Sequence, residues 1–284
     1  MASALTRLSG SAFELTLTVP WSDVKALYDQ VFTELSSEIE VEGFRKGKAP
    51  KELIEKQINK NSVYEEVINR ILPKSYSSAL EEHHLKPIIN PQVKILSGEE
   101  EKDWQFIAKA AEKPEVNLDD YKKHVQEITA KGKIWTPSSG TSSEATAGKP
   151  DESEEKSKKI NEIIDKLLEI CTVELPEIMV ESEVNRLMTE LIDDVRAAGL
   201  TYEQYLSSKS TTNEKLREQY VRQVTSSLKL ELILQAVASD LGIVVDEKEL
   251  SSIIDKETDP KKKEELKGQS YYLTSLLRRE KTLT

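Results

Sequence analysis

A short basic segment stands out in an otherwise acidic chain. It reads Gly43, Phe44, Arg45, Lys46, Gly47, Lys48, Ala49 and Pro50, and Lys51 follows it. The 284 residues carry 51 acidic against 40 basic side chains, a net charge of -11, yet no acid lies between positions 43 and 51. Arginine binds phosphate through a bidentate fork and lysine as a point charge, and a phenylalanine beside them offers an apolar or stacking surface. The segment could be a tip that contacts phosphates, although charge alone favours a solvated loop between helices.

Two predicted helices must position this basic segment. The first follows a strand at 13–19, where apolar and polar residues alternate, and Ser22 is its expected N-cap. A short helix is predicted near 51–58. A capping box starting at Ser62 opens a longer helix, which we expect to kink at Pro73. The two glycines and the proline of the basic segment predict a tight, exposed turn between the helices.

A predicted β-hairpin completes this first unit. Residues 92–96 and 104–110 read as two antiparallel strands joined by a polar turn. Alternate positions of the second strand place the larger apolar side chains on one face, at Trp104, Phe106, Ala108 and Ala110. The pattern predicts an N-terminal α/β domain over residues 1–115.

A polar stretch separates this domain from the rest of the chain. Residues 136–159 contain no Val, Ile, Leu, Met, Phe, Trp or Tyr, and are rich in Ser, Thr, Pro, Gly and Glu. Such a segment cannot bury enough surface to offset chain entropy, so we expect a linker over 116–158 that is flexible at 136–158. Apolar residues spaced three or four apart then predict an elongated, all-α domain over 159–284. The fold class is α+β, with the α/β domain first.

The composition excludes several other functions. Cys171 is the single cysteine, which rules out internal disulfides and thiolate zinc sites, and it reads as a small buried residue. No phosphate-binding glycine motif, membrane-spanning run or signal peptide is apparent, which favours a cytoplasmic protein without contact to membranes. His83 and His84 do not converge on a helix, and acid pairs such as 119–120 read as surface charge. We therefore predict no catalytic residue, no metal site and no cofactor.

The basic segment closely resembles the ribosome-docking signature of the trigger factor family, Gly-Phe-Arg-x-Gly-x-x-Pro. The matching positions are Gly43, Phe44, Arg45, Gly47 and Pro50. Its surroundings are also similar, at 86–91, 113–116, 175–176, 199–206 and the helix that begins near Leu216. The resemblance covers 1–128 and 159–284, and it is less specific in the second region.

This resemblance implies a chaperone that meets nascent or unfolded polypeptides at the ribosomal exit tunnel and delays their misfolding. It implies that ribosomal RNA and a protein at the tunnel rim are contacted by Gly43, Phe44, Arg45, Lys46, Gly47, Lys48 and Pro50. The helical domain would hold polypeptides on shallow aliphatic surface. The resemblance does not decide whether the protein forms a homodimer when it is not bound to the ribosome.

The sequence departs from the family pattern in one respect. Typical members carry an FKBP-type prolyl-isomerase domain where this chain has only the polar linker, so we predict a chaperone without isomerase activity. The alternative is an RNA-binding or ribosome-assembly protein whose helical domain is purely structural. A periplasmic chaperone of similar helical architecture is disfavoured because no signal peptide is apparent.

Overall fold

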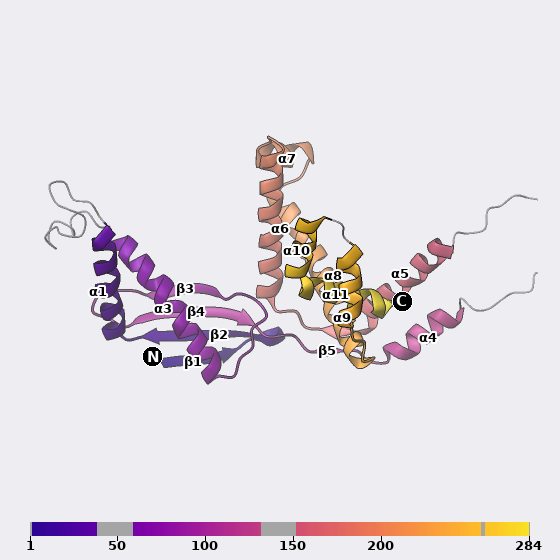
Figure 1. The fold of residues 1–284 in the computed structure, drawn as a ribbon, viewed down its shortest axis with the longest axis horizontal. Helices are drawn as coiled ribbons and strands as arrows, with labels where there is room; N and C mark the ends of the chain where they lie inside the picture. Colours follow the sequence, from indigo (N-terminus) through magenta and orange to yellow (C-terminus); the bar gives the residue numbers. More distant parts are fainter. Residues whose placement is uncertain (1, 39–58, 132–151, 257–258, 284) are drawn as a thin grey trace, which may run out of the picture. The chain divides into compact units, whose positions relative to one another are not determined.

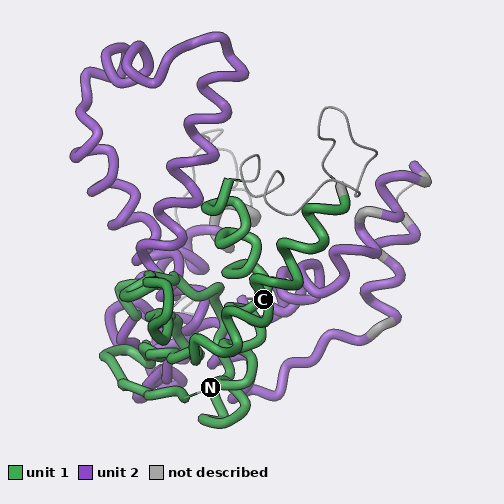
Figure 2. The backbone as a smooth tube through the Cα atoms, turned by 90° about the vertical axis from the view of Figure 1, so that its left-hand side faces the viewer, with its two compact units in different colours: residues 1–113, 176–179 green, residues 114–175, 180–284 purple. Residues whose placement is uncertain are grey.

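The computed structural model describes residues 2–38, 59–131, 152–256 and 259–283. The chain divides into two compact units, coloured separately in Figure 2. Unit 1 comprises Met1–Lys113 with Pro176–Met179, and unit 2 comprises Pro114–Leu175 with Val180–Thr284.

In its described part, unit 1 consists of a four-stranded antiparallel sheet and the helices α1 and α3 (Figure 1). The strand order is β1-β2-β4-β3, so β1 and β3 are the edges. Its elements are β1 (Ala2–Arg7), β2 (Ala12–Val19), α1 (Trp21–Glu38), α3 (Lys60–Glu82), β3 (Gln92–Ser97) and β4 (Trp104–Ala111), with a 3-10 turn at Ser9–Ser11.

One face of the sheet forms the core of unit 1. The predicted alternation in β2 is confirmed, because its apolar residues are buried and lie opposite those of β4, with Leu17 facing Phe106 and Leu15 facing Ala108. The shared face of β4 is confirmed in the same way. Val24 and Val31 of α1 and Val67 of α3 pack into this cluster, so the apolar stripes of both helices cover the sheet. The predicted α/β character of this region is therefore correct.

The helix boundaries differ in detail from the predicted ones. The N-cap of α3 is Asn59 rather than the expected Ser62, so the helix begins about one turn earlier, at Lys60; the Asn59 side chain accepts a hydrogen bond from the Asn61 amide at 3.0 Å. The helix continues through Pro73 to Glu82. The short helix expected near 51–58 lies outside the described residues. β1 was not predicted, since its alternating positions hold mostly small side chains.

Unit 2 is almost entirely helical in its described part. Its helices are α4 (Tyr121–Lys131), α5 (Glu152–Ile170), α6 (Glu177–Ala197, whose first turn belongs to unit 1), α7 (Tyr202–Ser208), α8 (Asn213–Asp240), α9 (Glu247–Lys256), α10 (Pro260–Gly268) and α11 (Ser270–Leu283). A two-stranded antiparallel ladder joins β5 (Val116–Asn117) to β6 (Thr172–Val173).

The core of unit 2 gathers around the C-terminal third of α8. Ile233, Leu234 and Val237 of α8 are buried against Tyr121 of α4 and Leu167 of α5. The predicted capping box at Thr201 is present, with hydrogen bonds in both directions between Thr201 and Gln204. The predicted helix ends at Gly199 and Gly242 are also correct. Both glycines have positive φ, which a glycine adopts without the strain a side chain would cause.

Two parts of the expected linker range are folded. Residues 116–131 form β5 and α4, and α5 already begins at Glu152. Residues 132–151 lie outside the described part. None of the helices in the described part is long and apolar enough to cross a membrane.

Candidate docking hairpin and polypeptide-binding surface

The residues predicted to dock on the ribosome, Gly43, Phe44, Arg45, Lys46, Gly47, Lys48 and Pro50, lie outside the described residues. The structure describes the two helices from which that segment leaves and to which it returns. α1 ends at Glu38, and Asn59 caps the start of α3. We call α1 and α3 the docking hairpin. Its rigidity decides how firmly Glu38 and Asn59, the described residues on either side of 39–58, are held.

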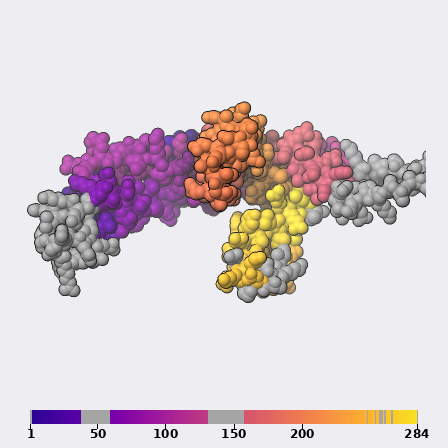
Figure 3. Space-filling model, turned by 90° about the horizontal axis from the view of Figure 1, so that it is seen from above, coloured from indigo at the N-terminus to yellow at the C-terminus, as the bar shows by residue number. Residues whose placement is uncertain are grey.

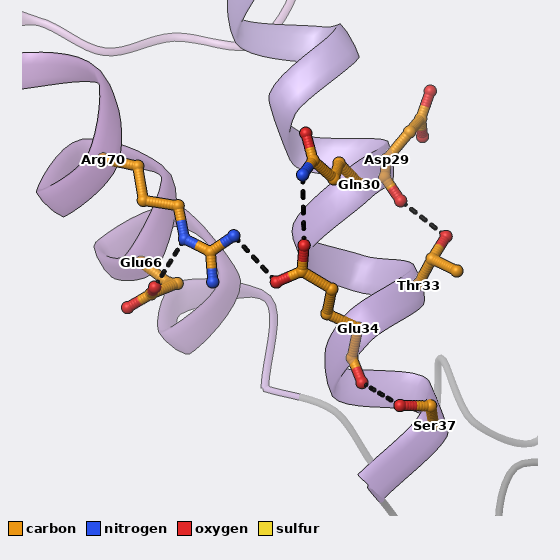
Figure 4. Close-up of polar contacts among 7 residues, drawn as sticks. All are labelled: Asp29, Gln30, Thr33, Glu34, Ser37, Glu66 and Arg70. Carbon is orange, nitrogen blue, oxygen red and sulfur yellow. Dashed lines mark hydrogen bonds and ion pairs between the residues drawn. The ribbon is translucent and has the colours of Figure 1, made fainter. Parts of the chain in front are cut away.

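Arg70 joins the two helices of the docking hairpin through two carboxylates (Figure 4). Its Nε donates to Glu66 Oε1 on the same helix at 2.7 Å, and its Nη1 lies 2.7 Å from Glu34 Oε2 on α1. Gln30 Nε2 donates to the other oxygen of Glu34 at 3.1 Å, so both carboxylate oxygens are engaged. Sequence reasoning missed this bridge, because only the fold brings Glu34 close to Arg70.

The bridge also shifts the protonation equilibria of its members. The Arg70 hydrogen bond, followed by that of Gln30, holds the pKa of Glu34 below its ordinary value. Hydrogen bonds to Glu66 and Glu34 raise the pKa of Arg70. Opposite charges in contact favour the ionised forms of both partners, so the bridge is ionised at neutral pH. The two helices therefore keep this link at neutral pH.

A row of aromatic rings fixes the docking hairpin to the sheet. The ring centroids of Tyr28 on α1 and Tyr64 on α3 are 5.0 Å apart, and Tyr64 lies 5.6 Å from Trp104 on β4. Trp104 in turn contacts Phe106 edge to face at 6.2 Å. The Tyr64 hydroxyl donates to Glu100 Oε1 at 2.6 Å, and burial followed by this bond raises the pKa of Tyr64. Both helices that flank residues 39–58 are thus anchored on a buried core.

The apolar stripes of unit 2 separate into core and surface once burial is known. Val184, Leu216, Val224 and Ile233 are buried and belong to the interior. Other large apolar side chains in the described part of unit 2 remain exposed, namely Leu200, Val221, Leu241, Val244, Tyr271, Tyr272 and Leu276. The sequence pattern could not make this distinction, because spacing gives the face of a helix and not what covers that face.

The exposed apolar side chains concentrate near the C-terminal helices, which are drawn in yellow in Figure 3. Tyr271 is 89% and Tyr272 58% exposed, both in the first turn of α11, and Val244 in the turn after α8 is 73% exposed. Tyr272 and Leu276 are four positions apart and so share one face of the helix. We call Leu241, Val244, Tyr271, Tyr272 and Leu276 the C-terminal apolar set. Permissive apolar surface of this kind suits partners of varied sequence.

Basic residues near the end of α11 hold this helix in place. Arg278 donates to the carbonyl of Ile243 at 3.0 Å and to the Ser239 hydroxyl at 3.2 Å. The ammonium group of Lys281 pairs with Glu249. These side chains are occupied in joining α11 to the turn between α8 and α9. Their role in the structure is therefore to orient the helix that carries the exposed tyrosines.

The residues with nucleophilic or metal-binding chemistry form no site in the described part of the chain. Cys171 is buried as predicted, and burial raises the pKa of its thiol. His83 caps the end of α3, where its Nε2 lies 2.9 Å from the hydroxyl of Ser3. No group of three or more metal-binding side chains occurs among the described residues.

Two sequence profiles of one family match this chain. The profile described as "Bacterial trigger factor protein (TF)" matches residues 1–133, and the one described as "Bacterial trigger factor protein (TF) C-terminus" matches residues 147–283. Only residues 134–146 lie between the two matched regions.

Individual relatives and a solved structure agree with these profiles. The trigger factor of Corynebacterium glutamicum strain R is 33% identical over 130 residues, which cover 46% of this chain and 29% of the relative. The trigger factor of Staphylococcus epidermidis is 35% identical over 122 residues, covering 43% and 28%. The chain thus aligns with less than a third of the length of these relatives.

A solved chain described as "Promiscuous Substrate Recognition in Folding and Assembly Activities of the Trigger Factor Chaperone" covers 100% of this chain and 98% of its own length. Its TM-score is 0.64 at 15% identity, which shows that the fold is shared. With both profiles matched and the fold in agreement, this chain belongs to the trigger factor family.

Proposed function

We propose that this protein is a cytoplasmic, ribosome-associated chaperone that binds nascent or unfolded polypeptides and delays their misfolding. The observation that carries the proposal is the signature segment Gly43–Pro50, which lies in the sequence between two helices that an ion pair joins to each other and aromatic contacts fix to a sheet. A docking tip on a rigid base loses less conformational freedom on binding than one on a loose base, which favours affinity.

The docking step depends on charge and on one anchor. Arg45 and Lys46 contact phosphates of ribosomal RNA, and Phe44 fills an apolar site on a protein at the tunnel rim. The net charge of -11 repels the polyanionic ribosome elsewhere, so the basic segment also selects the orientation in which the protein approaches. Because phosphate contacts release counterions, binding weakens as salt increases.

The C-terminal apolar set supplies the surface that holds unfolded polypeptides. Its members are exposed in the structure, so contact with a client needs no rearrangement of the core of unit 2. This exposure favours the chaperone over a ribosome-assembly protein with a purely structural helical domain, since a structural helix gains nothing from a tyrosine that is 89% exposed.

We propose that the protein lacks prolyl-isomerase activity. Support comes from the matched regions, which leave residues 134–146 between them, far too few to form an isomerase pocket. A refolding reaction limited by proline isomerisation measures this directly. Its slow phase should keep its rate when the protein is added, and strong acceleration would overturn this part of the proposal.

The docking proposal is tested by cosedimentation with ribosomes in a salt series. Replacing Phe44, Arg45 and Lys46 by alanine should abolish binding while the circular dichroism spectrum and melting temperature stay unchanged. A control variant, Lys25→Ala with Lys74→Ala, removes two exposed charges from the docking hairpin itself and should bind like the parent. Unchanged, salt-resistant binding of the triple variant would refute the docking role.

The chaperone and the assembly protein are separated by a client assay. Suppression of aggregation of a chemically denatured enzyme by the parent supports the chaperone. Ribosome binding without any suppression would favour the RNA-binding alternative. Sedimentation velocity of the free protein over a range of concentrations decides whether it forms a homodimer off the ribosome.

A further inference from the structure

The edge strand β3 leaves one side of the unit 1 sheet without a neighbouring strand. In the order β1-β2-β4-β3, this strand pairs only with β4 among the described residues. A strand at an edge presents a row of backbone N–H and C=O groups that can pair with a further strand. The first feature of this edge is therefore unfulfilled hydrogen-bonding capacity along the regular part of the strand, Gln92 to Ile95, which ends at a register shift between Ile95 and Ser97.

The second feature is apolar surface on the side of the sheet that elsewhere forms the core. Val93 lies opposite Ala108, and Ile95 lies opposite Phe106, so these pairs point to the same face. Phe106 and Ala108 are 0% exposed, whereas Val93 is 40% and Ile95 49% exposed. The core cluster includes neither β3 residue. Among the described residues, the helical layer thus ends at β4 and leaves the corresponding face of β3 open.

The strand at the opposite edge of the sheet, β1, is covered on this core face, unlike β3. Leu5 of β1 packs against the core cluster. Ser3 of β1 donates to Glu82 at 2.6 Å and lies 2.9 Å from His83, both at the C-terminal end of α3. β1 is therefore covered on the core side by a helix, and the open apolar face is particular to β3.

These two features together define the partner. A helix laid on Val93 and Ile95 would cover apolar surface but leave the backbone groups of the edge unpaired. An extended chain with apolar residues at alternate positions pairs with the backbone and packs on both side chains, as in other cases of strand addition. Unfolded polypeptides offer such segments, whereas in folded proteins they are buried in sheets.

A second copy of this chain fits the edge poorly. Two antiparallel copies of β3 that align Val93 with Ile95 also place Lys94 directly opposite Lys94. Like charges directly opposite each other destabilise a strand pair. A lysine on an edge strand is a common protection against pairing between identical edges. Lys94 therefore disfavours self-association but leaves the edge open to a chain that carries a neutral or acidic residue at that position.

We propose that β3 binds an extended, alternately apolar segment of an unfolded polypeptide as a fifth strand of the sheet, with Val93 and Ile95 as its apolar contacts. The inference rests on the proposed role with unfolded polypeptides, and it adds a binding surface in unit 1 to the C-terminal apolar set. The edge recognises backbone geometry, while the C-terminal set recognises apolar side chains of any conformation.

The probe is a fluorescein-labelled peptide of alternating Val and Thr with two terminal Glu residues, titrated with the full chain in fluorescence anisotropy. Two counterparts are N-methylated at alternate amides, each along a different edge of the extended peptide. Methylation of the edge that pairs with β3 should weaken binding at least tenfold, while methylation of the outer edge should not. Equal affinity of all three peptides, or no binding of the unmethylated one, would overturn the inference.

Variants of the protein locate the site. Val93→Thr with Ile95→Thr keeps residues that favour strands but removes apolar surface, and should weaken peptide binding at least fivefold. Ile88→Thr is the matched control, because Ile88 is 48% exposed in unit 1 but lies outside β3. Equal loss in both variants, or no loss in the β3 variant, would contradict the assignment. Lys94→Thr should self-associate more strongly than the parent in sedimentation velocity, and unchanged association would refute the role given to Lys94.

Variants in the C-terminal apolar set separate a failure of this inference from a failure of the proposed function. Tyr271→Ser with Tyr272→Ser should weaken the binding of unfolded clients, but the difference in affinity between the two methylated peptides, which depends on β3, should persist. If these tyrosine substitutions abolish the binding of unfolded clients but the β3 variant binds the peptide like the parent, the inference fails and the proposed function stands.

Discussion

Replacing Tyr271 and Tyr272 by serine should remove much of the affinity for unfolded polypeptides without unfolding unit 2. The tyrosines are 89% and 58% exposed. Full burial of a tyrosine removes roughly 200 Å² from water, so the pair still has about 300 Å² to offer to a client. At about 25 cal/mol per Å², this is an upper bound of about 7 kcal/mol. A client that covers a third of the area would lose about 2 kcal/mol, roughly a 30-fold weaker Kd.

The stability of the protein should hardly change in this variant. Substitutions at exposed sites usually alter the free energy of unfolding by less than about 0.5 kcal/mol. Affinity is measured by anisotropy with a labelled, permanently unfolded polypeptide such as reduced, carboxymethylated α-lactalbumin, and stability by thermal melting. Gln269→Ser, an exposed neutral substitution just before α11, is the control and should bind like the parent. A double tyrosine variant with parental affinity and an intact fold would refute the assignment of this surface.

Three further predictions concern the scaffold. Phe106→Ala should lower the free energy of unfolding by about 3–5 kcal/mol because Phe106 is fully buried. Ile107→Ala, on the other face of β4, should lower it by about 1 kcal/mol. Equal losses in thermal melts would contradict the assignment of one face of the sheet to the core. A backbone hydrogen bond from Lys86 and, to a smaller extent, a side-chain hydrogen bond from Arg7 hold the pKa of Glu112 below its ordinary value. The stability that this carboxylate contributes is therefore present above about pH 4.3 and is lost as the pH falls through the lower pKa of the folded state. Glu112→Gln should therefore lose less stability than the parent between about pH 5 and 3 in urea titrations, and parallel losses would argue against it. Because burial raises the pKa of the Cys171 thiol, iodoacetamide should alkylate it at pH 8 only slowly until denaturant is added, and fast labelling of the native protein would contradict its burial.

The sequence pattern was most informative where local chemistry decides the structure. Alternation in β2 and β4 predicted the buried face, and the capping box at Thr201 predicted the start of α7 to the residue. Local signals were weaker at Asn59, where a cap of equal quality preceded the expected one at Ser62, and in β1, whose small side chains give little periodic contrast.

Contacts between distant residues could not be predicted in the same way. The bridge from Arg70 to Glu34 and the ring contact between Tyr64 and Trp104 depend on how helices and strands meet in space. The exposure of Val93 and Ile95 likewise depends on where the helical layer ends, and not on the alternation of β3 itself. The docking residues themselves came from the resemblance of eight consecutive residues to a family signature, and their role stays a prediction.

The most direct test of the central claim is the salt dependence of ribosome binding by the parent and by the variant with alanine at Phe44, Arg45 and Lys46. If the four basic residues between positions 43 and 51 contact phosphates, the slope of log K against log salt should be about -3 for the parent, taking about -0.7 per phosphate contact. The variant should show a slope smaller by about 1.4 and little binding at physiological salt. Equal slopes and equal affinities of the two proteins would contradict docking through residues 43–51.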